Sequence, residues 1–332
     1  MASACVTGAT GYVASELIKQ LLGKGYKIKA TVRCPTDSPR LQYLRDIAQS
    51  SCGSLDLVQV PDLQQGSEAL DSALAGSQYV FHVASPFRFD GDPDLDIVQP
   101  AVRGTKAVLE AAAKQKPAVK RVVVTSSVCA IHDMNRKQQP KHEQFCEEDW
   151  NETSQMPGEA YWVSKVQAER AAWQLAEQLG LDVVTILPNF VLGPVISSEQ
   201  AGGVSVGFMK GILESPAGKP FEGSWTVNDV RDVAAAHILA AEKPEAKGRY
   251  IVSQPHSISA RFITDTLKAA YPAAAAALPD GADAEPSSIN SSKVQQELGL
   301  RLTPVADTVR DMAAALLQLG IAQPAWAAAA AE

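Results

Sequence analysis

Three side chains in this sequence have the types and the spacing that suit proton transfer to a carbonyl oxygen. Tyr161 and Lys165 lie four residues apart in EAYWVSKVQAER, a helical pattern that places both side chains on one helix face. A phenol is a weak acid at neutral pH, and a neighbouring ammonium lowers its pKa by favouring the ionised form. Ser127 follows the apolar run of KRVVVTSS and could hydrogen-bond the same oxygen. Taken alone, each feature has a structural alternative. Tyr161 and Lys165 could lie on a solvated helix face, and Ser127 could cap a loop.

Such chemistry needs a bound cofactor, and the start of the chain contains a candidate binding turn. A strand expected over residues 4–7 runs into VTGATGYVA and then into an amphipathic helix over residues 12–22. The free N–H groups of such a helix start suit the pyrophosphate of a dinucleotide. Gly8 permits the tight turn, Gly11 the close approach of phosphate, and Ala14 close helix packing. The spacing is one residue longer than G-x-G-x-x-G, and an ordinary strand-to-helix turn is the alternative.

The end of the second expected strand indicates which dinucleotide is bound. A fold that selects NAD places an acidic residue there, about 20 residues after the glycines, to hold the ribose 2′-hydroxyl. This chain instead has Arg33 in TVRCPTDSPR, with Arg40 seven residues later. A guanidinium fits a 2′-phosphate through forked, charge-assisted hydrogen bonds. The pattern favours NADP(H), and an ordinary surface arginine is the alternative.

Apolar strands alternate with helical patterns along most of the chain, which predicts an α/β fold. Several strands are continuous apolar runs, so both faces of a parallel, Rossmann-like doubly wound sheet are covered. The strands are expected at residues 4–7, 28–32, 55–58, 79–83, 121–125, 182–187 and 249–252. Glycine-rich sequence after the sixth strand predicts a smaller C-terminal substrate-binding lobe. The expected division is a Rossmann domain of residues 1–188 and 228–253, a lobe of residues 189–227 and 254–325, and an alanine-rich tail of residues 326–332.

Composition excludes several other classes of protein. The net charge of −7 argues against a general nucleic-acid-binding surface. No apolar run approaches the roughly 18 to 20 residues that cross a bilayer. Five cysteines without C-x-x-C spacing or clustered histidines indicate neither a disulfide framework nor a metal site. We therefore expect a cytoplasmic protein, a monomer or homodimer, with no nucleic-acid or membrane partner.

The motifs as a set resemble the extended short-chain dehydrogenase/reductase family, and within it the group of dihydroflavonol and cinnamoyl-CoA reductases. The resemblance covers most of the chain, from residue 7 to about residue 255. It is carried by TGATGYVAS at 7–15, VRCP at 32–35, VPDL at 60–63, FHVASPF at 81–87, KRVVVTSS at 120–127, YWVSK at 161–165, LPNFVLGP at 187–194 and VRDVAAAH at 230–237.

The resemblance implies a catalytic set of Ser127, Tyr161 and Lys165. Tyr161 would donate the proton while hydride passes from the nicotinamide to the carbonyl carbon, and Lys165 would lower the pKa of Tyr161 and hold the nicotinamide ribose. The residues implied to bind NADPH/NADP+ are Gly8, Thr10, Gly11, Tyr12, Val13, Arg33, Arg40, Asp62, Leu63, Val83, Ala84, Ser85, Thr125, Tyr161, Lys165, Pro188 and Val191.

The expected function is NADPH-dependent reduction of a ketone or aldehyde on an aromatic, flavonoid-like small molecule, such as a dihydroflavonol or flavanone 4-ketone. The residues expected to contact this substrate are Ser85, Phe87, Ser127, His132, Tyr161, Phe190, Phe208 and Trp225. The core could equally contain four of them, since large aromatic residues serve both uses: Phe87, Phe190, Phe208 and Trp225.

Two departures from the family pattern bear on the substrate. The catalytic helix reads PGEAYWVSK, whereas cinnamoyl-CoA reductases typically carry an N-W-Y-C-Y-G-K signature, which weakens a CoA-ester reading. His132 stands five residues after Ser127, where plant dihydroflavonol reductases usually have asparagine or aspartate. A neutral imidazole both donates and accepts, so it could meet a polyphenol hydroxyl or serve as a structural loop histidine.

Other functions stay open at this point. A cinnamoyl-CoA reductase or a general aldehyde/ketone reductase would use the same residues. A nucleotide-sugar epimerase or steroid-type dehydrogenase uses them with NAD, against which Arg33 argues. A non-catalytic dinucleotide sensor keeps the glycine turn without the tyrosine, and the intact set of Ser127, Tyr161 and Lys165 argues against it.

Overall fold

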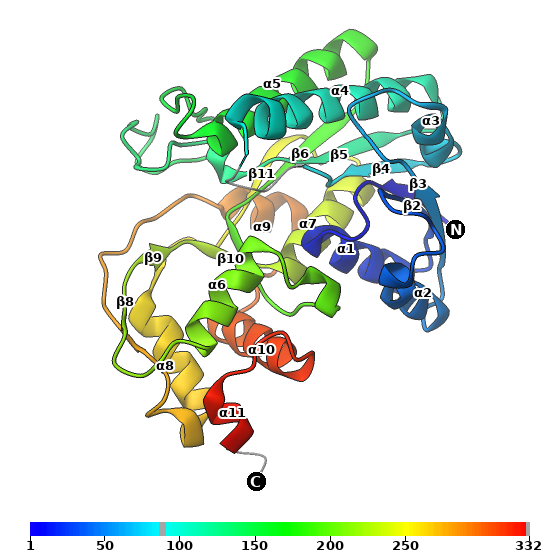
Figure 1. Ribbon diagram of the computed structural model, residues 1–332. Coiled ribbons are helices and arrows are strands. Elements are labelled where there is room, and N and C mark those ends of the chain that lie inside the picture. Colours follow the sequence, from blue (N-terminus) through cyan, green and yellow to red (C-terminus); the bar gives the residue numbers. More distant parts are fainter. Residues whose placement is uncertain (86–90, 330–332) are drawn as a thin grey trace.

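The centre of the protein is a seven-stranded parallel sheet with the order β11-β6-β5-β4-β1-β2-β3 (Figure 1). The computed structural model describes residues 1–85 and 91–329. The strands of this sheet are β1 Ser3–Val6, β2 Lys27–Val32, β3 Ser54–Gln59, β4 Tyr79–His82, β5 Arg121–Thr125, β6 Val183–Pro188 and β11 Gly248–Val252. The predicted Rossmann-like, doubly wound sheet is confirmed.

Strand β1 lies at the point where the strand order reverses. Its residue Ala4 is in register with Ile28 of β2 on one side and with Tyr79 of β4 on the other. In open parallel sheets, ligands bind at the carboxyl ends of the strands next to such a switch point. The topology therefore places the loops that follow β1 and β4 where a cofactor would bind.

Helices cover both faces of the sheet, which explains the continuous apolar strands. One face carries α1 Tyr12–Gly23, α2 Gln42–Gln49, α7 Val230–Glu242 and α9 Ser292–Leu298, and the other α3 Glu68–Leu74, α4 Gln99–Lys114 and α5 Ala160–Leu179 (Figure 1). In β5, Val123 faces the first group and Val122 and Val124 face the second. Burying each such side chain contributes about 1.5–3 kcal/mol.

A second hydrophobic core lies beyond the carboxyl edge of the sheet and forms what we call the C-terminal lobe. It is built from β7 Phe190–Leu192, α6 Val204–Leu213, β8 Pro220–Phe221, β9 Ser224–Trp225, β10 Val227–Asp229, β12 Ile258–Ser259, α8 Ala260–Ala270, β13 Asp280–Gly281, α10 Val305–Gln318 and α11 Ala325–Ala329. Trp326 in α11 donates its indole N–H to the carbonyl of Leu213 (3.1 Å). Helix α9 lies within residues 254–325, which were expected to belong to the lobe, but its buried side chains pack against the core of the sheet.

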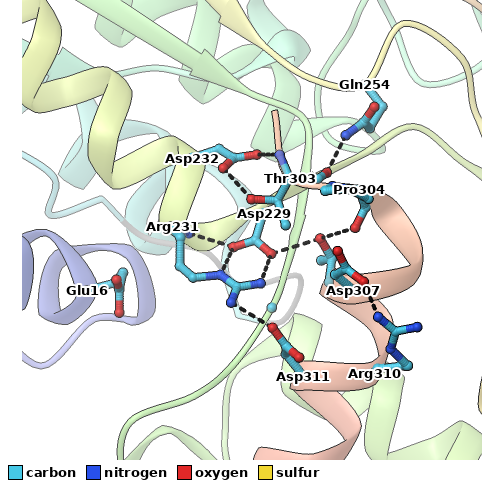
Figure 2. Close-up of polar contacts among 12 residues, drawn as sticks. Glu16, Asp229, Arg231, Asp232, Gln254, Thr303, Pro304, Asp307, Arg310 and Asp311 are labelled. Atoms are coloured by element: carbon cyan, nitrogen blue, oxygen red, sulfur yellow. Dashed lines mark hydrogen bonds and ion pairs between the residues drawn. The ribbon is translucent and has the colours of Figure 1, made fainter. Parts of the chain in front are cut away.

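A polar cluster at the start of α7 ties the sheet side to the lobe (Figure 2). Asp229 is buried, caps α7 and forms a two-oxygen ion pair with Arg231 (2.8 and 2.7 Å). On α10, Thr308 donates to Asp229 (2.8 Å) and Asp311 accepts from Arg231 (2.6 Å). Asp232 accepts from the backbone and hydroxyl of Thr303, both at 2.7 Å. These bonds hold α7 against α10.

In the ranges 1–85 and 91–329, no helix has both the length and the apolar character needed to cross a membrane. The same ranges contain no group of three or more side chains arranged to hold a metal ion.

Candidate active site

The turn between β1 and α1 has the geometry of an anion-binding loop. Gly8 has φ +73°, and a Cβ added there would lie 2.9 Å from the Cβ of Ala84, so only glycine fits. Gly11 begins α1 without any side-chain cap, which leaves the N–H groups of the first helical turn available. Thr10 and Gly11 are exposed and Tyr12 and Val13 are half-buried. The loop can accept a diphosphate at the helix N-terminus.

Thr7 fixes the loop after β4 against this turn. Its hydroxyl oxygen accepts from the N–H groups of Val83 and Ala84, both at 3.1 Å. The Thr7 hydroxyl lies 3.0 Å from Nδ1 of His82, to which it donates. The residues Val83, Ala84 and Ser85 are thereby held beside the glycines, as a wall under a bound cofactor requires.

The tautomer of His82 follows from its partners. Its Nε2 lies 3.2 Å from the hydroxyl of Thr105, which itself donates to the carbonyl of Ala101 (2.8 Å). Thr105 must therefore accept from Nε2–H, which leaves Nδ1 as the acceptor for Thr7. Burial lowers the pKa of His82 to about 4, so the ring is neutral. This network was not predicted from the sequence, where it shows only as polar residues among apolar neighbours.

The structure brings Ser127, Tyr161, Lys165 and Ser85 together. Ser127 lies two residues after the end of β5, and its Oγ accepts from the N–H of Cys129 (3.2 Å) as the cap of a short helix, Val128–Ala130. Tyr161 and Lys165 lie in the first turns of α5, with Nζ 5.4 Å from the centre of the phenol ring. Lys165 is buried and donates to Ser85 Oγ (3.1 Å). Side chains from two loops and one helix thus meet at the sheet edge.

The direction of the Tyr161 pKa shift differs from the sequence prediction. Burial raises the pKa of Tyr161 well above its usual value, and the hydrogen bond with Ser127 only opposes this effect. Burial also lowers the pKa of Lys165 to about 8 and raises that of the Cys129 thiol to about 11. Desolvation of the buried phenol is the largest cause of the raised Tyr161 pKa, and the neighbouring Cys129 thiol adds to it. At neutral pH the phenol therefore keeps its proton and can act as a proton donor.

The Lys165 ammonium should set the alkaline limit of turnover. Because burial lowers its pKa to about 8, the side chain is charged below that pH and loses its proton above it. We expect kcat/KM for reduction to be level below this pH and to fall as pH rises through it. Initial rates over a pH series test this, and Lys165→Arg should move the fall to higher pH because arginine stays charged. A profile that is flat to well above pH 9 in the unchanged protein would contradict the assignment.

The two arginines predicted to hold a 2′-phosphate have different surroundings. Arg33 follows β2, is exposed, and its side chain makes no hydrogen bond with any described residue. Arg40 lies in a short helix, Pro39–Leu41, and forms an ion pair with Glu199 (2.5 Å).

The two residues predicted to contact the adenine lie after β3. Asp62 is exposed and accepts from the N–H of Gln64 (2.8 Å). Leu63 packs against the core beneath α3 and α4.

Several other predicted cofactor residues already have partners inside the protein. The Thr125 hydroxyl donates to Nε2 of His237 (2.7 Å), since Nδ1 of that ring bonds the carbonyl of Val233. Burial lowers the pKa of His237 to about 4 and keeps it neutral. Tyr12 donates to the carbonyl of Gly193 (2.5 Å). The Pro188 carbonyl faces Ser127 Oγ at 3.5 Å, and Val191 lies half-buried in β7.

Three of the aromatic residues predicted for the substrate lie in one cluster of the lobe. Phe208 is in contact with Phe190 and Trp225, with ring centres 5.1 and 5.0 Å apart. Phe221, which sequence reasoning missed, stacks on Trp225 at 5.3 Å. All four rings are half-buried. Phe87, the remaining aromatic prediction, lies outside the described residues.

His132 is buried in the loop after Ser127. Its Nδ1 bonds the carbonyl of Asp133 (2.8 Å), and its ring centre lies 5.1 Å from that of Phe145. Burial lowers its pKa, so Nδ1 carries the proton and Nε2 is an acceptor. No described residue hydrogen-bonds Nε2. The ring therefore retains one unused acceptor.

The largest feature that sequence reasoning missed is a buried ion pair beneath the catalytic helix. Glu169 lies one turn after Lys165 and pairs with Arg249 of β11 through two bonds (2.8 and 3.1 Å). The carboxylate also accepts from Ser126 (2.6 Å) and Thr185 (2.9 Å). Both charged side chains are buried. This pair fixes α5 relative to the end of β5, and hence Tyr161 relative to Ser127.

Comparisons with known proteins agree with this geometry. The sequence profile of the NAD dependent epimerase/dehydratase family matches residues 4–253. The chain belongs to this family. Within the family, it is 35% identical over 326 residues to Cinnamoyl-CoA reductase 1 of Arabidopsis thaliana, covering 96% of this chain and 90% of that protein. It is 34% identical over 278 residues to the bifunctional dihydroflavonol 4-reductase/flavanone 4-reductase of Malus domestica, covering 81% and 76%.

A solved structure has the same fold as this chain over nearly its whole length. The yeast methylglyoxal/isovaleraldehyde reductase Gre2, complexed with NADPH, matches with a TM-score of 0.85 and 28% identity over 96% of this chain and 99% of that chain. The predicted extended short-chain dehydrogenase/reductase membership, in the dihydroflavonol and cinnamoyl-CoA reductase group, is confirmed. So is the prediction of an oxidoreductase that uses a nicotinamide cofactor.

Proposed function

We propose that the protein uses NADPH to reduce a carbonyl group on an aromatic, flavonoid-like small molecule. The observation that carries this proposal is the meeting of Ser127, Tyr161, Lys165 and Ser85 at the sheet edge, beside a glycine turn built for a diphosphate. The similarity to a cinnamoyl-CoA reductase and to a dihydroflavonol/flavanone 4-reductase supports the proposal, as does the similarity to yeast Gre2, which was solved with NADPH.

The residues present fit the proposed cofactor. The uncapped start of α1 and the close approach of Gly8 to Ala84 leave room and N–H donors for the diphosphate. Arg33 and Arg40 supply positive charge at the end of β2 for a 2′-phosphate. Lys165 has donors beyond its bond to Ser85 and would hold the nicotinamide ribose. When bound, the cofactor supplies the hydride and its electron pair.

The side chains of the protein supply the oxygen-binding and proton-donating parts of the reaction. Ser127 and Tyr161 hydrogen-bond the carbonyl oxygen and stabilise the negative charge that develops there as hydride reaches the carbon. Tyr161 then gives its hydroxyl proton to this oxygen, forming the alcohol and leaving a phenolate. The charged Lys165 stabilises that phenolate, which regains a proton from solvent before the next turnover.

Two features, one in the lobe and one in the loop after Ser127, favour an aromatic substrate. The half-buried cluster of Phe190, Phe208, Phe221 and Trp225 begins two residues after Pro188, whose carbonyl faces Ser127. His132 Nε2 is an acceptor that a substrate hydroxyl could satisfy. We propose that residues 189–227 and 254–325, apart from α9, form the substrate-binding side. An aldehyde or CoA-ester substrate is the second candidate, because the match to Cinnamoyl-CoA reductase 1 covers 96% of this chain.

A substrate panel tests the proposal. NADPH consumption should be followed with a dihydroflavonol, a flavanone, a cinnamoyl-CoA, a cinnamaldehyde and an aliphatic aldehyde, with each alcohol product identified. We expect the highest kcat/KM for the flavonoid ketones. Activity with the CoA ester or aldehydes alone would assign the protein to the second candidate. Tight NADPH binding without turnover of any compound would contradict the proposal and favour a sensor.

A further inference from the structure

One segment of the lobe reaches across the cofactor loop to the predicted 2′-phosphate site. We call residues 193–201 the crossing segment. Gly193 accepts from the Tyr12 hydroxyl (2.5 Å), and Gln200 donates to Ser15 Oγ (2.6 Å), so the segment lies against the first turn of α1. Its last part is a short helix, Ser198–Gln200, capped by Ser197.

Glu199 in this segment forms an ion pair with Arg40. The Arg40 Nε and Glu199 Oε2 atoms are 2.5 Å apart, a contact that joins two turns 159 residues apart in sequence. The Arg40 side chain is 68% exposed and that of Glu199 36%, so both are accessible to a ligand from solvent.

The other groups around Arg40 do not neutralise it. Burial raises the pKa of Tyr43 to about 12, and the Glu199 charge adds to this effect, so the tyrosine is a neutral neighbour of the pair. Its buried hydroxyl bonds no described residue. Arg45 is turned to the carbonyls of Thr36 and Ser38 in its own loop. Glu199 is therefore the acidic partner that the structure gives to Arg40.

We infer that Glu199 is a specificity-determining residue that competes with the 2′-phosphate of NADPH for Arg40. This inference rests on the proposed function. A phosphate carries up to two negative charges and three acceptor oxygens and needs the guanidinium that Glu199 occupies. The negative charge of the Glu199 carboxylate also repels a phosphate bound beside it. The same carboxylate has no such conflict with NADH, whose ribose carries a neutral hydroxyl at that position. Glu199 thus narrows the preference for NADPH over NADH.

Binding measurements on the full-length protein test this without turnover. Dissociation constants for NADPH, NADH, 2′,5′-ADP and 5′-AMP should be measured at low ionic strength for the unchanged protein and for Glu199→Gln. We expect Glu199→Gln to bind NADPH and 2′,5′-ADP about 3- to 10-fold more tightly, with NADH and 5′-AMP changed less than about twofold. Added salt should shrink the gain.

Two further variants make the result specific. Glu222→Gln removes one negative charge from an exposed position elsewhere on the lobe and should leave all four constants unchanged. In an Arg40→Ala background, Glu199→Gln should give a smaller gain for 2′,5′-ADP, because the competition for Arg40 is gone. Weaker or unchanged NADPH binding in Glu199→Gln, or equal gains for NADH, would overturn the inference.

The same data separate this inference from the proposed use of NADPH. If the unchanged protein prefers 2′,5′-ADP over 5′-AMP and Glu199→Gln does not increase that preference, the inference fails alone. If a preference appears only in Glu199→Gln, the competition stands and the proposed NADPH preference of the unchanged protein fails. If neither protein shows one, both fail.

Discussion

Replacement of Tyr161 by phenylalanine is expected to lower kcat by about 10²–10⁴-fold, the usual contribution of a general acid. The ring and its packing remain, and only the hydroxyl that supplies the proton is lost. NADPH affinity should stay within about twofold, because the phenol proton is used only in the chemical step. Steady-state rates and direct titration of NADPH measure the two quantities separately.

Tyr271→Phe is the matched control for this change. Tyr271 lies in the lobe, where its ring packs against Trp326 with centres 5.4 Å apart. Tyr271→Phe loses the same atom, but Tyr271 packs against α11, which lies at the end of the lobe opposite the sheet (Figure 1), so turnover should be unchanged. Equal turnover in Tyr161→Phe and Tyr271→Phe would remove Tyr161 from the mechanism.

Replacement of Arg249 by methionine is expected to lower the free energy of unfolding by about 3–5 kcal/mol, because it leaves a buried carboxylate without its partner. Glu169 has no exposed surface on its side chain, and Arg249 has 8%. Arg249 also donates to the carbonyls of Glu147 (2.9 Å) and Asp149 (2.5 Å), which anchors the loop before α5. Denaturant titration measures the change.

An exposed pair provides the control for Arg249. Arg261 pairs with Asp283 at 2.8 Å, with side chains 55% and 74% exposed. Arg261→Met should therefore cost less than about 1 kcal/mol. Combining Glu169→Gln with Arg249→Met should restore part of the loss, since no charge is then buried alone. A loss for Arg249→Met no larger than that for Arg261→Met would show that the buried pair does not stabilise the fold.

The sheet was predictable because its strands are short apolar runs separated by helical patterns. The expected strand over residues 28–32 is Lys27–Val32 in the structure, and that over 182–187 is Val183–Pro188. The proximity of Tyr161 to Lys165 followed from helix periodicity. These features depend on local pattern and general topology rules.

Features that depend on distant partners were not predictable from the sequence. Arg249 stands in the otherwise apolar strand GRYIV, and its partner Glu169 is 80 residues away, with no local pattern linking them. The same holds for Arg40 and Glu199. The Tyr161 pKa was predicted in the wrong direction because spacing shows the neighbouring charge and not the burial of the hydroxyl, which is set by packing.

The most direct test of the central proposal is the transfer of deuterium from NADPH labelled at C4 of the nicotinamide to a dihydroflavonol or flavanone. With NADPH that carries deuterium at both C4 positions, the account predicts an alcohol with one deuterium on the former carbonyl carbon for each NADPH consumed, and almost none of this product with Tyr161→Phe. NADPH consumption without a labelled alcohol, or tight NADPH binding without consumption across the whole substrate panel, would contradict it.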